Sequence, residues 1–235
     1  MAWPLPEKGV LGIFGRQPVA GKAKTRLAAA IGPDLAAEVH ESMLLDLLEL
    51  WDSERILARG GRRVVGYAPP EAGPWFQARV PSSFVLQPQV EGDLGQRMQA
   101  FFAGEFQNGA EQVVLVGADC PALDPVHVIS AFIWLKVRDV VIGPSTDGGY
   151  YLLGCRKLPP IFEGIDWNTN DVLAQTIDRL SHTSLELAML PPCYEVDTPG
   201  DLRTLSGHLR ALRRAGLNPG LPRTESAVER AVPRH

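Results

Sequence analysis

The sequence predicts an α/β protein with a mainly parallel central sheet and helices on both of its faces. Apolar runs typical of buried strands alternate along the chain with helical patterns, and glycine-rich loops follow several of the runs. Strands joined through helices of this length lie parallel, and ligands then collect at the carboxyl ends of the strands. The functional site should therefore be built from loops that follow strands.

The expected elements account for nearly the whole chain in order. Residues 10–14 form the first strand, a basic glycine loop follows it, and residues 35–51 carry apolar side chains at helical spacing. Further strands are expected at 64–67, 84–86, 113–116, 140–142, 151–153 and 185–190, with helices at 94–106, 125–137, 171–180 and 199–214. We expect one domain over residues 1–214 and a poorly anchored tail over 215–235.

The loop after the first strand, FGRQPVAGKAKTRL, is the most informative segment. It carries Arg16, Gly21, Lys22, Lys24 and Arg26 just before a helix. Backbone N–H groups of such a loop and the positive end of the helix attract anions, and the basic side chains add the charge that a diphosphate or triphosphate requires. The alternative interpretation is a solvated basic turn.

Spacing excludes two familiar phosphate-binding motifs. A P-loop has four residues between its glycines and Ser or Thr after its lysine, whereas five residues separate Gly15 from Gly21 and Ala23 follows Lys22. A dinucleotide fingerprint needs three closely spaced glycines, and this segment has two.

Composition excludes several classes of partner. A net charge of −4 predicts no general attraction to nucleic acid or membranes, so the basic loop favours a small anionic ligand. The first residues lack the pattern of a signal peptide, and no apolar stretch is long enough to span a bilayer, so a cytoplasmic protein is expected. Cys120, Cys155 and Cys193 are far apart and predict buried reduced thiols. The five scattered histidines favour structural or surface positions over catalytic ones.

Two aspartates are candidate metal ligands. Asp119 directly follows the strand at residues 113–116, where Asp124 before Pro125 already provides the cap of the next helix. Asp197 precedes Thr198, which begins a capping box with Asp201 and so leaves Asp197 free. Both loops lie at the same edge of the sheet, and Mg²⁺ usually takes one or two carboxylates, so we expect the two carboxylates within about 8 Å. Without metal, we expect them to repel each other and to raise the pKa of at least one.

Two further glycine loops follow strand signals. In GPSTDGGYYLLG, Asp147, Gly148 and Gly149 fit a hairpin turn, and equally a substrate loop in which Asp147 and Tyr150 bind hydroxyl groups or a base edge. In GDLGQRM, Gly92 opens a helix, Arg97 lies one turn inside it, and Asp93 fits an N-cap.

In combination, these motifs resemble the bacterial GT-A-like transferases of the nucleotide-diphospho-sugar transferase superfamily. The motifs FGRQPVAGKAKTRL, GDLGQRM, GADCPAL, GPSTDGGYYLLG, GIDWNT and YEVDTPGDL occur in order between Leu11 and about Leu212. The AKTRL segment is also similar to 2-phospholactate guanylyltransferases, and the spacing of Gly21 and Lys24 is similar to that in molybdenum-cofactor guanylyltransferase-like enzymes. Both of these relatives transfer a nucleotidyl group.

The resemblance implies a three-layer GT-A, Rossmann-like fold and a role for each motif. Arg16, Gly21, Lys24 and Arg26 would bind the nucleotide phosphates, with Lys24 also catalytic. Asp119 and Asp197 would be catalytic and would hold Mg²⁺ or Mn²⁺. The remaining implied contacts form two groups: Gly92, Asp93 and Arg97 on the nucleotide, and Asp147, Gly148, Gly149, Tyr150 and Trp167 on the acceptor.

The sequence therefore predicts a nucleotide-dependent transferase with a small-molecule acceptor. Metal-dependent nucleotidyl transfer from a nucleoside triphosphate to a small phosphorylated acceptor is favoured, because positioning and charge neutralisation suffice for it. Glycosyl transfer from a nucleotide-diphospho-sugar is the first alternative, although Cys120 and Pro121 stand where sugar-transferring members usually complete an Asp-x-Asp pair. A nucleotide-binding module without catalysis is the second.

Overall fold

The computed structural model describes residues 5–52 and 61–232 and confirms an α/β fold. These residues form seven strands, eight α-helices and one 3-10 helix, which in chain order are β1 (Gly9–Arg16), α1 (Thr25–Ile31), α2 (Pro33–Asp52), β2 (Arg62–Ala68), η1 (Pro70–Ala72), α4 (Gly73–Gln77), β3 (Val85–Pro88), α5 (Leu94–Gln107), β4 (Gln112–Gly117), α6 (Pro125–Trp134), β5 (Val140–Pro144), β6 (Tyr150–Cys155), α7 (Val172–Ser181), β7 (Leu187–Met189), α8 (Pro199–Arg214) and α9 (Pro222–Ala231). Each strand expected from the sequence is present. Helices α4 and α9 were not expected, and α1 begins at Thr25, inside the segment expected to be a loop, so that Arg26 lies in its first turn.

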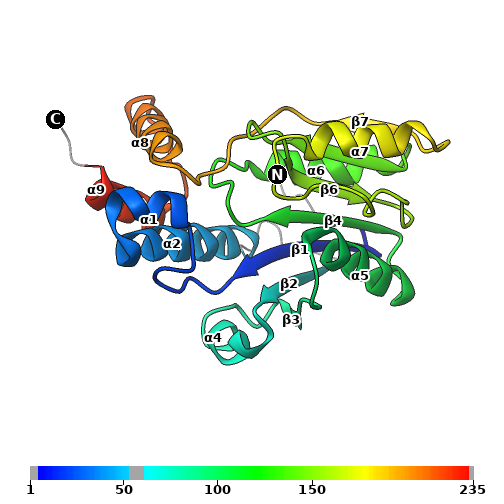
Figure 1. Ribbon diagram of the computed structural model, residues 1–235, viewed down its shortest axis with the longest axis horizontal. Helices are drawn as coiled ribbons and strands as arrows, with labels where there is room; N and C mark the ends of the chain where they lie inside the picture. The colour runs from blue at the N-terminus through cyan, green and yellow to red at the C-terminus, as the bar shows by residue number, and fades with distance from the viewer. Residues whose placement is uncertain (1–4, 53–60, 233–235) are drawn as a thin grey trace.

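The strands form one mixed, mostly parallel sheet in the order β3-β2-β1-β4-β6-β5-β7 (Figure 1). Only β6 runs antiparallel, to β4 on one side and to β5 on the other. The remaining neighbours are parallel, so the carboxyl ends of β1, β2 and β4 share one edge. The loops that follow these strands can therefore meet there.

Helices cover both faces of the sheet because alternate strand residues point to opposite sides. In β4, Val114 and Val116 pack in a core with α2, α4 and α6. Val113 and Leu115 pack on the opposite face with α5 and α7. The result is the three-layer arrangement that the sequence predicts.

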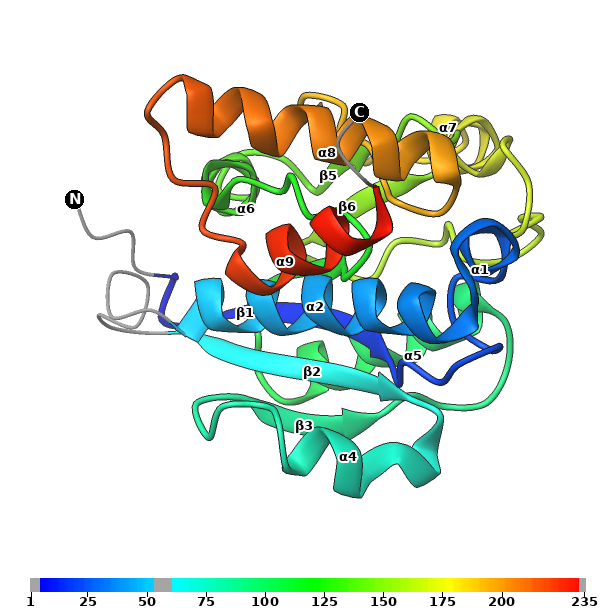
Figure 2. The same ribbon diagram turned by 90° about the vertical axis from the view of Figure 1, so that its left-hand side faces the viewer.

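The expectation of a poorly anchored C-terminal tail is wrong for residues 222–231. They form α9, which lies between α2 and α8 (Figure 2) and buries Ala227 and Val228 in a cluster with both helices. The carboxylate of Asp46 on α2 accepts hydrogen bonds from the backbone N–H of Thr224 at 2.8 Å and from the Arg223 guanidinium at 3.1 Å. These distant partners anchor a segment that has few apolar residues of its own.

Cysteine placement ties two loops of the carboxyl edge together. Cys120, Cys155 and Cys193 are free and buried. The Sγ atoms of Cys120, after β4, and Cys193, after β7, lie 2.7 Å apart.

No helix among the described residues has the length and apolar character needed to cross a membrane.

Candidate functional site

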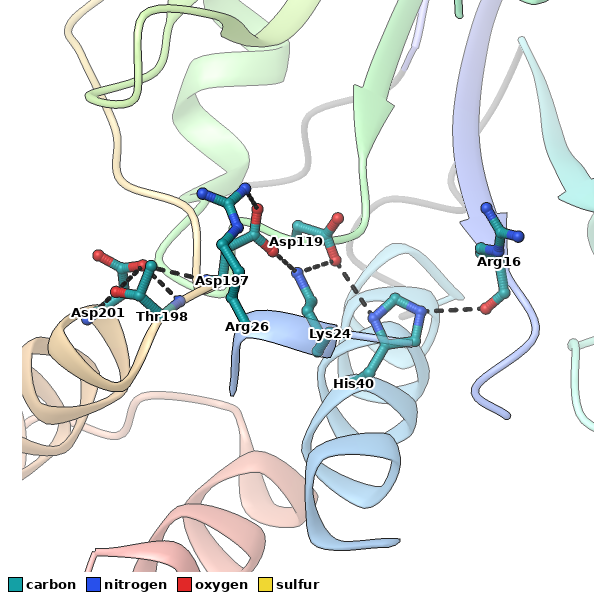
Figure 3. Close-up of polar contacts among 8 residues, drawn as sticks. All are labelled: Arg16, Lys24, Arg26, His40, Asp119, Asp197, Thr198 and Asp201. Atoms are coloured by element: carbon teal, nitrogen blue, oxygen red, sulfur yellow. Dashed lines mark hydrogen bonds and ion pairs between the residues drawn. The ribbon is translucent and has the colours of Figure 1, made fainter. Parts of the chain in front are cut away.

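A buried lysine lies at the centre of the site. Lys24 directly precedes α1, with a left-handed backbone at φ 48° and ψ 49°, and its side chain is only 4% exposed. Its Nζ lies 2.7 Å from Oδ1 of Asp119 and 2.6 Å from Oδ1 of Asp197 (Figure 3). One ammonium therefore bridges the two aspartates.

The two aspartates lie in loops that a backbone hydrogen bond holds together. Asp119 follows β4 and Asp197 immediately precedes the Thr198 cap of α8, and the N–H of Val196 donates to the carbonyl of Asp119 at 3.0 Å. Since both Oδ1 atoms contact one nitrogen, the sum of the two distances, 5.3 Å, is the largest separation they can have. The structure thus brings the two carboxylates together within the expected 8 Å.

Neither Asp119 nor Asp197 is the N-cap of a helix, which agrees with the expectation from the sequence. Asp124 caps α6 by accepting from the N–H of Val126. Thr198 and Asp201 form the capping box of α8. The carboxylates of Asp119 and Asp197 are therefore available for other contacts.

The expectation that repulsion raises an aspartate pKa is wrong for Asp119. Burial alone would raise the pKa of this carboxyl, but the Lys24 ammonium and the His40 ring hold it well below its usual range. Burial would likewise lower the pKa of Lys24, yet the charges of Asp119 and Asp197 keep it raised. The lysine converts a repulsive pair into a stable ionic cluster.

His40 links this cluster to the end of β1. Its ring is buried on α2, with Nδ1 3.3 Å from Oδ1 of Asp119 and Nε2 3.1 Å from the carbonyl oxygen of Arg16 (Figure 3). Both ring nitrogens thus face an oxygen. His40 fixes the position of Asp119 relative to the basic loop.

A basic cavity of about 250 Å³ opens beside the cluster. Arg26 contacts Oδ2 of Asp197 at 3.5 Å, and its side chain is 73% exposed. Gly21, at φ 77°, adopts the left-handed conformation that favours glycine in this loop. The cavity is lined by Arg16, Lys22, Ala23, Lys24, Thr25, Arg26, His40, Asp119 and Asp197.

A second cavity, of about 210 Å³, shares Asp119 with the first. Its walls are mostly apolar and include Phe14, Leu94, Met98 and Tyr150. Glu195 also lines it, and burial together with the nearby charge of Asp119 raises the pKa of Glu195 to about 8. Asp119 therefore lines both the basic cavity and the apolar cavity.

The predicted acceptor loop forms the hairpin turn between β5 and β6. The carboxylate of Asp147 accepts from the N–H of Gly149 at 3.1 Å, and Gly148, at φ 93°, leaves no room for a Cβ against the backbone of Asn170. The turn interpretation thus explains these residues structurally. Tyr150 reaches the apolar cavity and packs edge-on against Trp167, with ring centroids 6.4 Å apart.

The second predicted glycine loop does not reach the basic cavity. Asp93 is the N-cap of α5, where its carboxylate accepts from the N–H of Gln96 at 2.8 Å. Arg97 donates to the carbonyl of Gly92 at 2.9 Å and lines a separate small cavity with Phe14 and Gln89. Lys24, Arg26, Asp119 and Asp197 line the basic cavity together, whereas Gly92, Asp93 and Arg97 do not line it.

The residues present fit a divalent metal that is partly coordinated by phosphate. Over residues 5–52 and 61–232, no group of three or more His, Cys, Asp or Glu side chains could hold a metal. Asp119 and Asp197 nevertheless direct one oxygen each at a single cation, the Lys24 ammonium. Mg²⁺ commonly takes one or two carboxylates and completes its shell with water and phosphate oxygens.

Two residues of the site were missed in the sequence. His40 interrupts the apolar stripe of α2 between the buried Val39 and Met43, which was a detectable signal for a buried polar contact. Glu195 stands two positions before Asp197, in a motif that drew attention to the aspartate alone.

Comparison with known proteins supports this fold. No curated protein matches the chain. A crystal structure from Desulfovibrio desulfuricans G20, described as a candidate nucleotide-diphospho-sugar transferase, is 30% identical, with 96% of this chain and 98% of that chain covered and a TM-score of 0.82.

More distant structures share the fold alone. The 4-diphosphocytidyl-2C-methyl-D-erythritol synthase of Anaerococcus prevotii DSM 20548 is 8% identical, with 86% of this chain and 99% of that one covered and a TM-score of 0.54. The homologue of Mycobacterium tuberculosis Rv0371c from Mycobacterium sp. strain JC1 is 13% identical, with 90% and 100% covered and a TM-score of 0.52.

A family model described as "Uncharacterized protein conserved in bacteria (DUF2064)" matches residues 53–169. This segment contains β4, the Asp119 loop and the hairpin of β5 and β6. Together with the likeness to the Desulfovibrio protein over nearly the whole length of both chains, the match shows that this chain belongs to the DUF2064 family, with the fold of GT-A-like nucleotide-diphospho-sugar transferases.

Proposed function

We propose that the protein is a metal-dependent transferase that binds the phosphates of a nucleotide donor in the basic cavity. One observation carries the proposal: a cavity with four cationic side chains adjoins two carboxylates that converge on one cation. Phosphates need cationic partners, and a divalent ion needs the carboxylates, so both halves of a metal–phosphate complex find complementary groups here.

Each residue of the cluster has a defined part in the proposal. Arg16, Lys24 and Arg26 bind and neutralise the donor phosphates. Asp119 and Asp197 hold Mg²⁺ or Mn²⁺, which when bound supplies a positive charge to the reacting phosphate. His40 holds Asp119 in place through the contact between its Nδ1 and Oδ1 of the carboxylate.

Nucleotidyl transfer is the reaction that this arrangement supports best. An oxygen of the acceptor phosphate attacks the α-phosphorus of a nucleoside triphosphate, the bond to the bridging oxygen breaks, and pyrophosphate leaves with the electron pair. Positioning and charge neutralisation accelerate such a step without a protein nucleophile. The assignments of Gly21, Gly92, Asp93 and Arg97 to the nucleotide, and of Asp147 to Tyr150 and Trp167 to the acceptor, rest on the family resemblance.

The apolar cavity favours a second candidate, glycosyl transfer from a nucleotide-diphospho-sugar. None of the described residues that line this cavity is a lysine, arginine or histidine. Two carboxyl groups, those of Asp119 and Glu195, do line it. A phosphate dianion placed there would be desolvated beside carboxyl groups, which is costly. An uncharged hydroxyl acceptor would fit this cavity better.

Product analysis separates the candidates. A thermal-shift screen of nucleoside triphosphates and nucleotide sugars, with and without Mg²⁺ or Mn²⁺, first identifies the donor, since a ligand at 100 times its Kd adds about 2.7 kcal/mol of stability. The donor is then incubated with matched acceptors such as glucose and glucose 1-phosphate. Pyrophosphate release supports nucleotidyl transfer, nucleoside diphosphate release supports glycosyl transfer, and binding without turnover over a broad acceptor panel favours a non-catalytic module.

A further inference from the structure

The two aspartates proposed to hold the metal already share a cation of the protein itself. Lys24 places its ammonium 2.7 Å from Asp119 and 2.6 Å from Asp197, and its side chain is 4% exposed. Arg26 adds a weaker contact to Asp197 at 3.5 Å from an exposed position (Figure 3). A free divalent ion therefore meets carboxylates whose charge is largely compensated.

Displacing this ammonium without a substitute partner is unfavourable. A buried charge that loses its counter-ion keeps the cost of desolvation and gains nothing in return. Protein ligands alone also leave the metal poorly coordinated, because the described part of the chain offers no third carboxylate, histidine or cysteine in a metal-binding group. A free metal ion would therefore have to compete with the Lys24 ammonium, and the protein would not complete its coordination shell.

Donor phosphates remove both obstacles together. The basic cavity that would receive them is lined by Lys24 as well as by Asp119 and Asp197. A phosphate there supplies an anionic partner for the displaced ammonium and oxygen ligands for the metal. Lys24 directly precedes the first residue of α1 and lines this cavity, so its ammonium lies within the space that would receive the phosphates.

We infer that Lys24 is an exchangeable counter-ion, so that the site takes up the divalent cation together with the donor phosphates, as a metal–nucleotide complex, and binds the free cation weakly. In the exchange the ammonium moves from the two carboxylates to phosphate oxygens, which leaves Asp119 and Asp197 available to hold the metal. No covalent bond changes. The inference rests on the proposed function, which it deepens by coupling the two ligands.

Mn²⁺ binding followed by electron paramagnetic resonance tests the coupling without any assay of activity. For the wild-type protein, we expect Mn²⁺ affinity to rise about 10- to 100-fold when the nucleoside triphosphate selected by thermal shift is present, the range of one charge-assisted hydrogen bond. Lys24→Met removes the competing ammonium at similar length. We expect it to bind Mn²⁺ alone about 10- to 100-fold more tightly than the wild type does.

Lys22→Met is the matched control. Lys22 lines the same cavity, and in the described part of the chain it forms no ion pair with either aspartate. Removing its charge should change the affinity for Mn²⁺ alone by less than about threefold, because a solvated charge acts weakly at this distance. An equal gain in both variants would show a general charge effect and overturn the inference.

The remaining outcomes separate the inference from the proposed function. Tight binding of Mn²⁺ alone to the wild type, unchanged in Lys24→Met, overturns the exchange and leaves the metal site standing. No Mn²⁺ binding to either protein with any nucleoside triphosphate overturns the metal site, and the exchange with it. If Lys24→Met does not fold, the wild-type comparison with and without nucleotide still decides, because absence of coupling there is sufficient to reject the exchange.

Discussion

Two carboxylates, Asp46 on α2 and Asp119 beside it, differ in exposure and in the kind of partner that holds them. Asp46 is completely enclosed, and its oxygens accept from the backbone N–H groups of Thr224 and Arg223, at 2.8 and 3.3 Å, and from the Arg223 guanidinium. Asp119 is 37% exposed, and among the described residues its carboxylate contacts the side chains of Lys24 and His40. Helix α2 thus carries Asp46, which anchors α9, and also His40, which contacts Asp119 of the candidate site.

The two carboxylates differ in whether their hydrogen-bonding or ionic partners can move away while the protein stays folded. Backbone N–H groups keep their positions as long as the helix exists, so Asp46 fixes α9 permanently. A lysine side chain can rotate to another anion without unfolding anything, so Asp119 can exchange its partner. Enclosure with backbone donors indicates a structural carboxylate, and exposure to a cavity with side-chain donors indicates a functional one.

The largest expected effect is that of Asp119→Asn on transfer. Loss of a carboxylate that holds the metal should reduce metal-dependent turnover about a thousandfold, because the metal contributes several kcal/mol to charge stabilisation. The free energy of unfolding should fall by only about 1 kcal/mol, since the side chain is partly exposed. Product release and calorimetry measure the two effects, and turnover near the wild-type level would remove Asp119 from the metal site.

Asp46→Ala should give the reverse pattern. The buried N–H of Thr224, the N–H of Arg223 and the Arg223 guanidinium lose their acceptor. The free energy of unfolding should therefore fall by about 3 kcal/mol, while the affinity for the metal–nucleotide complex stays unchanged in the folded protein. Glu49→Ala is the control, because Glu49 pairs with the same arginine at the surface and should cost less than about 1 kcal/mol. Denaturant titration of both variants checks this, and equal losses would contradict the anchor role.

Arg26→Ala should lower the affinity for the nucleotide donor without affecting the fold. Its exposed guanidinium is a proposed phosphate contact, so nucleotide affinity should fall about tenfold, or about 1.4 kcal/mol, with the fold intact. Arg210→Ala removes the same charge from α8, away from the basic cavity, and should leave affinity unchanged. Isothermal titration compares them, and unchanged affinity in Arg26→Ala would exclude this contact.

Local patterns were sufficient to predict most of the fold and part of the site. Each strand carries its own apolar run, and the caps at Asp124 and Thr198 use chemistry confined to four residues. The proximity of Asp119 and Asp197 also follows from strand direction, since both loops lie at one edge of the sheet.

Long-range pairing explains what could not be predicted. Helix α9 depends on Asp46, 177 positions from Arg223, and no pattern within the tail encodes that partner. The lysine between the aspartates likewise arises from side-chain placement across three loops, and it reverses the pKa shift expected from the carboxylates alone. The near-complete enclosure of the Lys24 side chain has no signal within the loop either.

Asp147→Ala should have a smaller effect, on the acceptor side. If Asp147 contacts the acceptor, turnover should fall about tenfold with donor affinity unchanged, as for the loss of one hydrogen bond to a charged group. Asp147→Asn is the informative partner, because its amide oxygen can still accept from the N–H of Gly149 and preserve the turn. Full turnover in the Asn variant together with a loss in the Ala variant would assign Asp147 to the hairpin alone.

The smallest effect concerns Glu195 and depends on pH. Burial and the charge of Asp119 raise the pKa of Glu195 from its ordinary value of 4.5 to about 8, so the folded state binds a proton more tightly than the unfolded chain does. The protonated carboxyl therefore contributes stability that is complete below pH 4.5 and is lost as the pH rises to about 8. Glu195→Gln cannot ionise, so relative to the wild type it should gain about 1–2 kcal/mol between pH 5 and pH 8.5, a value reduced because the carboxyl faces a cavity. Denaturant titrations of both proteins at these two pH values test the sign, and a difference that does not change with pH would show that Glu195 is already ionised in the folded protein at pH 5.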